Sequence, residues 1–113
     1  MNVTHLSNPV VRAAVQAMND ADRKAWSALF EAGAVLTEAG HRRSLAQWSE
    51  HELFGPGKGH LASIERQEDD GLTVHGRFHS NQWGELETIL RFQVDGGKIR
   101  RLDVRTSKSS AAG

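Results

Sequence analysis

A glycine- and proline-rich segment, Gly55–Gly59 (GPGKG), divides the chain into halves with different hydrophobic patterns. Glycine and proline at this density end a helix or strand that reaches them. Before the segment, apolar residues recur at the spacing of amphipathic helices, and after it apolar and polar residues alternate as they do in half-buried strands. Helices followed by a run of strands predict an α+β fold in which the helices cover one face of a sheet.

Three helices are expected before the break, and their N-caps are Asn8, Asp22 and Ser44. Pro9 supplies the proline that is favoured in a first helical turn. The first helix should end near Asn19 and the second near Gly33, where residues that terminate helices occur. Between the second and third helices, residues 34–37 form a short β-prone run that ends at Gly40.

Four runs with period-two alternation follow the break: His60–Gln67, Leu72–His79, Glu85–Val94 and Lys98–Arg105. Turn-forming sequences separate neighbouring runs, so we expect an antiparallel meander. In the third run, the even-numbered residues from Leu86 to Val94 share one face, which predicts that they point into the core. The alternation fails near Arg100 and Arg101, which indicates a β-bulge in the last strand.

Length and composition limit what the chain can be. At 113 residues it has the length of one domain, and we expect a single domain over 1–113 with a core at about 8–106 and a flexible tail at 107–113. The absence of cysteine excludes disulfides and thiolate metal sites and favours a cytoplasmic location. Fourteen basic residues balance fourteen acidic ones, so we expect no nucleic-acid partner, and no apolar stretch is long enough to predict a membrane span.

Four segments carry a family resemblance: Val15–Asp22, Trp26–Phe30, Ala34–Glu38 and the closing hairpin Leu90–Val104. In this order they resemble the nuclear transport factor 2-like superfamily, whose members include SnoaL-like polyketide cyclases, ketosteroid isomerase and scytalone dehydratase. The resemblance implies a cystatin-like cone in which three N-terminal helices pack on a curved, mainly antiparallel sheet and enclose an apolar pocket. It also implies a homodimer that packs through the outer face of the sheet.

Glu38 is the candidate catalytic residue. In the resemblance to ketosteroid isomerase it falls on the position of the general base, just after the first strand. The two positions that donate hydrogen bonds to the enolate oxygen in that enzyme fall on Ala14 and Thr88, and the chain contains no tyrosine. Steroid isomerisation is therefore not expected, because an enolate would lack strong donors. Glu38 is either a base at the mouth of an apolar pocket or a solvated carboxylate at a strand end.

The candidate ligand-binding residues are large or inward-facing side chains: Trp26, Phe30, Trp48, Phe54, Leu86 and Thr88. They either line a cavity, with Thr88 orienting a polar group of the ligand, or pack as an ordinary core. Trp26 and Trp48 favour the first interpretation, since a tryptophan carries a hydrogen-bond donor and often lies at a cavity rim.

The histidines do not indicate a metal site. His75 and His79 share one face of a predicted strand, but four residues along a strand separate them by roughly 14 Å, which is too far for one metal ion. We expect that face to form cross-strand pairs with Glu85 and Glu87, or to face a second copy of the chain. No metal or other cofactor is predicted.

Two functions from different classes fit these features. The first is a SnoaL-like domain that binds a small apolar or ring-containing molecule in its pocket, with cofactor-independent isomerase, cyclase or dehydratase chemistry open to it. The second is a non-catalytic dimeric interaction module whose own side chains fill the cone. An open cavity of several hundred Å³ beside Glu38 would favour the first function.

Overall fold

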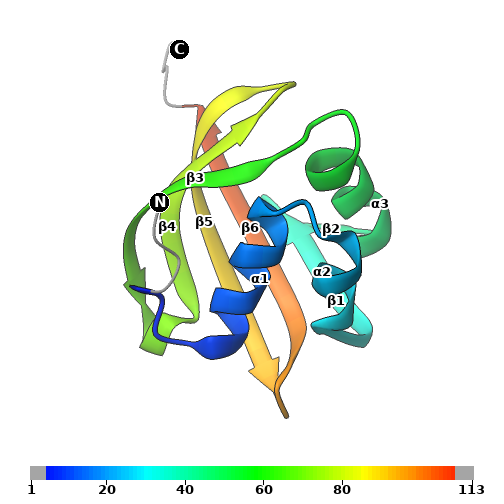
Figure 1. Cartoon of the computed structure of the whole chain (residues 1–113), viewed down its shortest axis with the longest axis vertical. Coiled ribbons are helices and arrows are strands. Elements are labelled where there is room, and N and C mark those ends of the chain that lie inside the picture. Colours follow the sequence, from blue (N-terminus) through cyan, green and yellow to red (C-terminus); the bar gives the residue numbers. More distant parts are fainter. Residues whose placement is uncertain (1–4, 109–113) are drawn as a thin grey trace.

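The described part of the chain is α+β, with three helices on one side of a mixed six-stranded sheet (Figure 1). The computed structural model describes residues 5–108, with side chains as far as Thr106. The helices are α1 (Pro9–Asn19), α2 (Arg23–Ala28) and α3 (Leu45–Ser49), and a π-helical segment, η2 (Glu50–Phe54), continues α3. The strands are β1 (Phe30–Glu38), β2 (His41–Arg43), β3 (His60–Glu68), β4 (Thr73–Ser80), β5 (Gly84–Asp95) and β6 (Lys98–Lys108), and a short 3₁₀ turn, η3 (Asp69–Gly71), joins β3 to β4.

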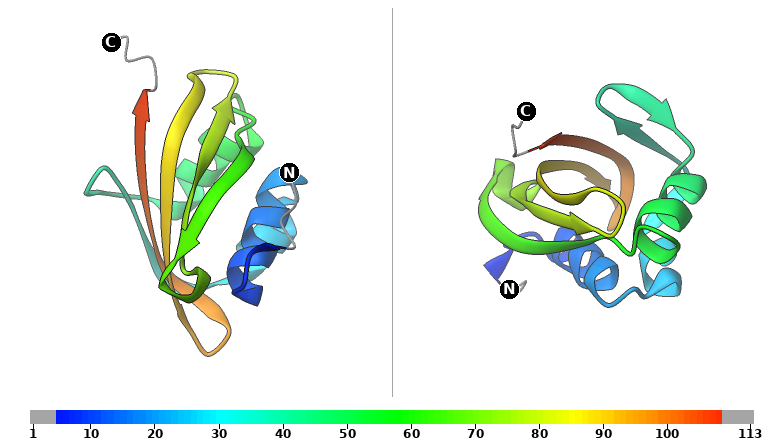
Figure 2. Two further views of the ribbon diagram at one scale, coloured as in Figure 1. Left: turned by 90° about the vertical axis from the view of Figure 1, so that its left-hand side faces the viewer. Right: turned by 90° about the horizontal axis from the view of Figure 1, so that it is seen from above.

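The strands follow the order β2-β1-β6-β5-β4-β3 across the sheet. Strands β3 to β6 form the antiparallel meander expected from the alternating half of the chain, and β1 lies parallel to β6. The sheet is strongly curved (Figure 2). The predicted bulge is confirmed, because Gln93 pairs with Arg101 whereas Val94 pairs with Ile99, which leaves Arg100 as the extra residue.

The predicted helix starts are confirmed. The side chains of Asn8, Asp22 and Ser44 each accept a hydrogen bond from a backbone N–H of the following helical turn, at 2.9, 3.0 and 3.3 Å. Asn19, at the predicted end of α1, ties that helix to β3. Its Nδ2 donates to the carbonyl of Leu61 at 3.2 Å, and the backbone N–H of Leu61 donates to its Oδ1 at 2.8 Å. Local capping therefore fixes where the helices begin, and one side chain anchors α1 to the sheet.

The second helix is shorter than its sequence predicts. It ends at Ala28 and not near Gly33, because the chain already enters the sheet at Phe30. The backbone N–H of Ile99 donates to the carbonyl of Leu29 at 2.8 Å, so pairing with β6 takes a backbone group that a longer helix would need. Strand β1 accordingly begins four residues before the expected β-prone run.

Strand β2 has no counterpart in the sequence prediction. Its three residues are polar and exposed, so they show no alternation. It forms a hairpin with β1 through Ala39 and Gly40, both of which have positive φ, 52° and 84°. The hairpin matters for the site because it brings Arg43 back beside the end of β1.

The helices cover the apolar inner face of the sheet. On α1 the buried side chains are Val11, Ala14, Val15, Ala17 and Met18. On β5 the inner-face side chains Leu86, Thr88, Leu90 and Phe92 are buried and Val94 is partly buried, as the alternation predicts. A Cβ at Gly76 of β4 would lie 2.2 Å from the carbonyl oxygen of Ser63, so glycine is required for β3 to approach this closely.

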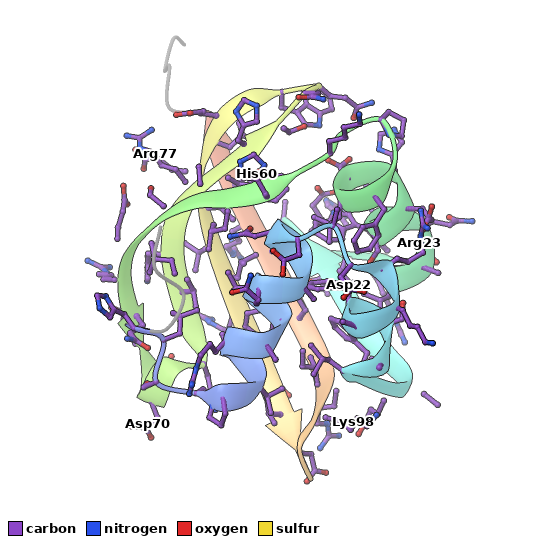
Figure 3. All side chains as sticks on the ribbon, in the orientation of Figure 1. Asp22, Arg23, His60, Asp70, Arg77 and Lys98 are labelled. Carbon is purple, nitrogen blue, oxygen red and sulfur yellow. The ribbon has the colours of Figure 1, made fainter. Side chains whose placement is uncertain are left out.

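The outer face of the sheet carries the predicted cross-strand pairs. In the register of β4 and β5, Arg77 lies opposite Glu87, and His79 lies opposite Glu85. The Nε of Arg77 also lies 3.7 Å from Oε2 of Glu65 on β3. Figure 3 shows Arg77, on β4, on the side of the molecule remote from α2. The helical and charged sides of the sheet are therefore distinct surfaces.

Strand β6 continues to Lys108, past the expected core boundary at about 106. The remaining residues of the expected tail, 109–113, lie outside the described residues. Within the described part of the chain, no helix has the length and apolar character needed to cross a membrane. The cytoplasmic location stays a prediction.

Candidate ligand-binding pocket

A pocket of about 370 Å³ opens between the inner face of the sheet and the segment formed by α3 and η2. Its lining residues are Glu38, Trp48, Glu52, Phe78, Trp83, Leu86, Thr88, Leu90, Val104 and Thr106. Four residues predicted from the sequence, Glu38, Trp48, Leu86 and Thr88, are therefore brought together at one place. The wall is mostly apolar, and its charged groups are two glutamate carboxylates.

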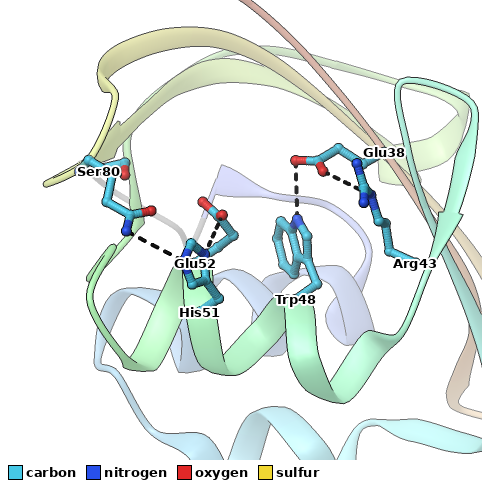
Figure 4. A network of polar contacts seen from close by, with 7 residues as sticks. Glu38, Arg43, Trp48, His51, Glu52 and Ser80 are labelled. Atoms are coloured by element: carbon cyan, nitrogen blue, oxygen red, sulfur yellow. Dashed lines mark hydrogen bonds and ion pairs between the residues drawn. The ribbon is translucent and has the colours of Figure 1, made fainter.

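Glu38 is the last residue of β1 and lies on the inner face, like the buried Leu36 two residues before it. The hairpin with β2 returns Arg43 to this point, where its Nε lies 3.5 Å from Oε1 of Glu38. The indole Nε1 of Trp48 donates a hydrogen bond to the other oxygen, Oε2, at 3.4 Å (Figure 4). The carboxylate is thus held from two sides at the pocket wall.

Glu52 is a second pocket carboxylate, and the sequence prediction missed it. It lies on η2, its side chain is 15% exposed, and its Oε2 lies 2.9 Å from Nδ1 of His51. The Nε2 of His51 lies 3.4 Å from Nε2 of Gln82 in the turn between β4 and β5. The spacing held a signal, because residues four apart on a helix share a face, and Trp48 and Glu52 are four apart. Two carboxylates from two elements therefore face one cavity.

The glycine-rich segment after η2 holds this part of the wall in place. The backbone N–H groups of Gly57 and Gly59 donate to the carbonyls of His51 and Glu52, at 3.0 and 2.7 Å. A Cβ at Gly59 would lie 2.2 Å from the ring of Phe78, so glycine is required where the chain passes this ring. The segment that ends the helical half of the sequence therefore also shapes the cavity.

Trp83 lies at the rim of the pocket, in the turn between β4 and β5. It is 55% exposed, which is a large exposure for an apolar ring of this size. In the same turn the backbone N–H of Asn81 donates to the carbonyl of Gly57 at 2.7 Å, which fastens the turn to the glycine-rich segment. No hydrophobic pattern marks Trp83 in the sequence, because it stands alone among polar residues.

No family model matches the sequence, and no curated protein matches it. Solved structures do match. A candidate polyketide cyclase from Sinorhizobium meliloti has a TM-score of 0.73 at 19% identity, covering 92% of this chain and 99% of that one. A candidate ketosteroid isomerase from Kribbella flavida has a TM-score of 0.70 at 15% identity, covering 90% and 78%. An NTF2-like protein of unknown function from Cytophaga hutchinsonii has a TM-score of 0.68 at 12% identity, covering 92% of each chain. The chain has the nuclear transport factor 2-like fold.

This confirms, for the fold, the resemblance that the order of short segments indicated. Three of the predicted ligand-binding residues, Trp26, Phe30 and Phe54, do not line the pocket beside Glu38. Trp26, Phe30 and Phe54 border a groove on the other side of α3. Trp26 is 1% exposed, and its Nε1 donates to the hydroxyl of Ser49 at 2.9 Å. A role for these three in ligand binding stays a prediction.

Few polar side-chain groups line this pocket of the nuclear transport factor 2-like fold and could contact a ligand. They are the carboxylates of Glu38 and Glu52, the hydroxyls of Thr88 and Thr106, and the indole N–H groups of Trp48 and Trp83. Among the described side chains, no three of His, Asp or Glu gather closely enough to hold a metal ion. The arrangement can bind an apolar body, accept hydrogen bonds or protons at two carboxylates, and offer weak neutral donors.

Proposed function

We propose that this chain binds a small apolar or ring-containing molecule in the pocket beside Glu38. We further propose that Glu38 is the general base of an isomerase-, cyclase- or dehydratase-type reaction without a cofactor. The observation that carries the proposal is the cavity of about 370 Å³, whose mostly apolar wall contains a carboxylate held in place. Cavities of this size with an apolar wall and few polar groups are typical of ligand sites. The cavity also argues against the alternative, an interaction module filled by its own side chains.

The chemistry follows from the groups in the wall. An oxygen of Glu38 can take a proton from a carbon of the ligand, which keeps the C–H electron pair, and can return the proton to another carbon. The hydroxyl of Thr88 donates to the carbonyl of Leu86 at 3.3 Å, and it would have to turn away from this carbonyl to donate to an oxygen on which charge develops. Ala14, at the other donor position of steroid isomerisation, is fully buried on α1 and offers none. We therefore propose a substrate whose carbanion is already well stabilised by its own structure.

The test combines a binding screen with Glu38→Gln. Trp48 and Trp83 line the pocket, so quenching of tryptophan emission can report binding across a panel of small ring compounds. For a compound that is turned over, Glu38→Gln should lower kcat by about a hundredfold or more, the usual contribution of a general base. Glu65→Gln, the same change on the outer sheet face, should keep full activity. Unchanged turnover in Glu38→Gln would refute the base, and a panel without any ligand would favour the interaction module.

We also propose that two copies pair through the outer face of the sheet. Ile89 is only partly buried and borders two grooves on that face. One groove is lined by Glu65 and Glu87 together with Arg105, and the other by Arg91, Arg101 and Arg105 together with Asp103, so the first carries a net negative and the second a net positive charge. A twofold axis near Ile89 would place the acidic end of one copy against the basic end of the other, as a self-complementary dimer requires.

Light scattering of the full chain at micromolar concentration tests the dimer. The wild type should have twice the mass of one chain. Ile89→Glu should be a monomer, because it would place two like charges at the twofold axis. A wild type that is monomeric under these conditions would refute the pairing without affecting the pocket.

A further inference from the structure

The charges that line the pocket have one sign. Glu38 and Glu52 enter it from β1 and η2, and among the described lining residues there is no lysine or arginine. Arg43 contacts Glu38 from outside the wall with a largely exposed guanidinium, and the mostly exposed His51 contacts Glu52 in the same way. A ligand inside the pocket therefore meets carboxylate oxygens, whereas Arg43 and His51 are not among the lining residues.

Aromatic rings lie next to these carboxylates. Figure 4 shows Trp48 between the two glutamates, and Phe78 and Trp83 belong to the same wall. The exposed ring of Trp83 is apolar surface at the rim that a bound ligand would cover. The faces of aromatic rings attract cations, and tryptophan attracts them most strongly. Aromatic rings and carboxylates in one wall are complementary to the same kind of group, a cation that carries apolar substituents.

We propose that the pocket selects an organic cation, an apolar molecule that carries a protonated amine or a quaternary ammonium group. Glu38 and Glu52 balance its charge, and the ring faces of Trp48 and Trp83 contact its alkyl or aryl groups. An anion of the same shape would lose its hydration and gain no positive partner in the wall. The inference rests on the proposed function, because it names the class of molecule that the pocket binds. It gives Glu52 a role in ligand selection that the proposed reaction does not.

Three probes of one shape test this preference. They are the cation benzyltrimethylammonium, its uncharged carbon analogue neopentylbenzene, and the anion phenylmethanesulfonate. Binding to the full chain is followed by quenching of tryptophan emission and checked by calorimetry. The quaternary cation keeps its charge at every pH, so its own titration cannot change its affinity. The cation should bind at least about tenfold more tightly than the anion, with the neutral probe between them.

Two variants locate the source of the preference. Glu38→Gln and Glu52→Gln keep the side-chain shape and remove one charge each, so each should reduce the cation-to-anion preference by about threefold or more. Glu52→Asp keeps the charge and should keep most of the preference. Glu65→Gln makes the same change on the outer sheet face, outside the pocket, and should leave the binding of the three probes unchanged. Circular dichroism identifies any variant that has lost the fold, and the wild-type probe comparison needs no variant.

The outcomes separate this inference from the proposed function. If neopentylbenzene binds the wild type as tightly as the cation, the pocket binds apolar molecules without selecting charge, and the inference alone fails. The inference also fails if both Gln variants keep the full preference. If none of the three probes binds while ring compounds of the screening panel do, the inference again fails alone. If neither probes nor panel compounds bind, both proposals fail.

Discussion

Trp26 and Trp48 lie in aromatic clusters on opposite sides of α3, and their surroundings differ. Trp26 is 1% exposed, its ring centroid lies 4.9 Å from that of Phe30, and its N–H donates to Ser49 at 2.9 Å. Trp48 is 8% exposed and lines the pocket, and its N–H reaches Glu38 only at 3.4 Å. Trp26 is almost fully buried although it borders a groove, and it makes a short hydrogen bond, whereas Trp48 is more exposed, lines the pocket and makes a long hydrogen bond.

The difference teaches that residue type does not decide whether an aromatic cluster is core or site. The deciding features are the partner of the polar atom and the presence of open space. A short hydrogen bond from a fully buried N–H contributes to folding, because breaking it leaves the donor without an acceptor. The long hydrogen bond from Trp48 to the pocket carboxylate of Glu38 can be replaced by a contact with a ligand at little cost in free energy. Substitutions in the Trp26 cluster should therefore change stability, and substitutions in the Trp48 cluster should change binding.

Trp26→Ala should have the largest effect, a loss of about 3–5 kcal/mol in the free energy of unfolding. The ring is enclosed, so its removal leaves a cavity that the surrounding side chains cannot fill. Trp48→Ala should lose less, because its ring already borders an open pocket and no new closed cavity forms. Urea unfolding of the two variants measures both losses. Equal losses would remove the distinction between the clusters.

Ser49→Ala should come next, with a loss of about 1–3 kcal/mol, because it leaves the buried N–H of Trp26 without its acceptor. Trp26→Phe removes the donor, so Ser49→Ala made in that background should cost much less. The double-mutant cycle isolates the hydrogen bond from the packing of the ring. A Ser49→Ala variant with wild-type stability would mean that the indole N–H finds another acceptor.

The fold could largely be predicted from the sequence because its signals are local. Alternation from Leu86 to Val94, a capping side chain at Asn8 and a break in alternation at Arg100 each act over a few residues, and each is confirmed. Whether the candidate site residues come together in space, by contrast, depends on contacts between segments that are far apart in the sequence. Glu38 on β1 and Thr88 on β5 reach one pocket because β1 pairs in parallel with β6, a contact that no short pattern specifies.

Glu52 shows a second limit of sequence reasoning. A helical pattern can place it on the face of Trp48, but whether that face borders a cavity depends on how η2 ends. The hydrogen bonds from Gly57 and Gly59 to the carbonyls of η2 set that ending. The sequence shows that the glycine-rich segment interrupts the chain, yet not that it folds back onto the preceding turn. Trp26 and Phe30 illustrate the same limit, since their residue types suited the pocket beside Glu38 and the fold places them at a different groove.

Trp48→Phe should change the free energy of unfolding by less than about 1 kcal/mol, because the smaller ring keeps most of the packing and the lost hydrogen bond is long. Arg43, which contacts Glu38 in the wild type, should still do so in this variant. The affinity for benzyltrimethylammonium should fall by about threefold, since the ring of phenylalanine attracts cations less strongly than indole does. Urea unfolding and emission quenching measure the two effects. A destabilisation as large as that of Ser49→Ala would place Trp48 in the structural core.

Asp103 offers a stability measurement that is independent of both clusters, because it lies on the outer face of the sheet beside Thr37. Partial burial acts to raise the pKa of its carboxyl, but hydrogen bonds from Arg101 and Thr37 and the charges of Arg101 and Arg91 outweigh it, and the pKa lies below its usual value. The folded chain thus favours the carboxylate. This stabilisation is complete above the ordinary pKa of about 3.9 and is lost as pH falls through the lower native pKa.

Asp103→Asn should therefore be less stable than the wild type at neutral pH, and the difference should shrink as the pH falls below about 4. Urea midpoints across a pH series measure it, with Asp95→Asn, whose side chain is mostly exposed at the end of β5, as the control for loss of one negative charge. A difference that stays constant with pH would assign the effect of Asp103 to packing. Variants of Trp26 and Trp48 both retain Asp103, so the contribution of this carboxylate to the free energy of unfolding should fall equally in both as the pH is lowered. The difference in stability between the Trp26 and Trp48 variants should therefore persist at acid pH.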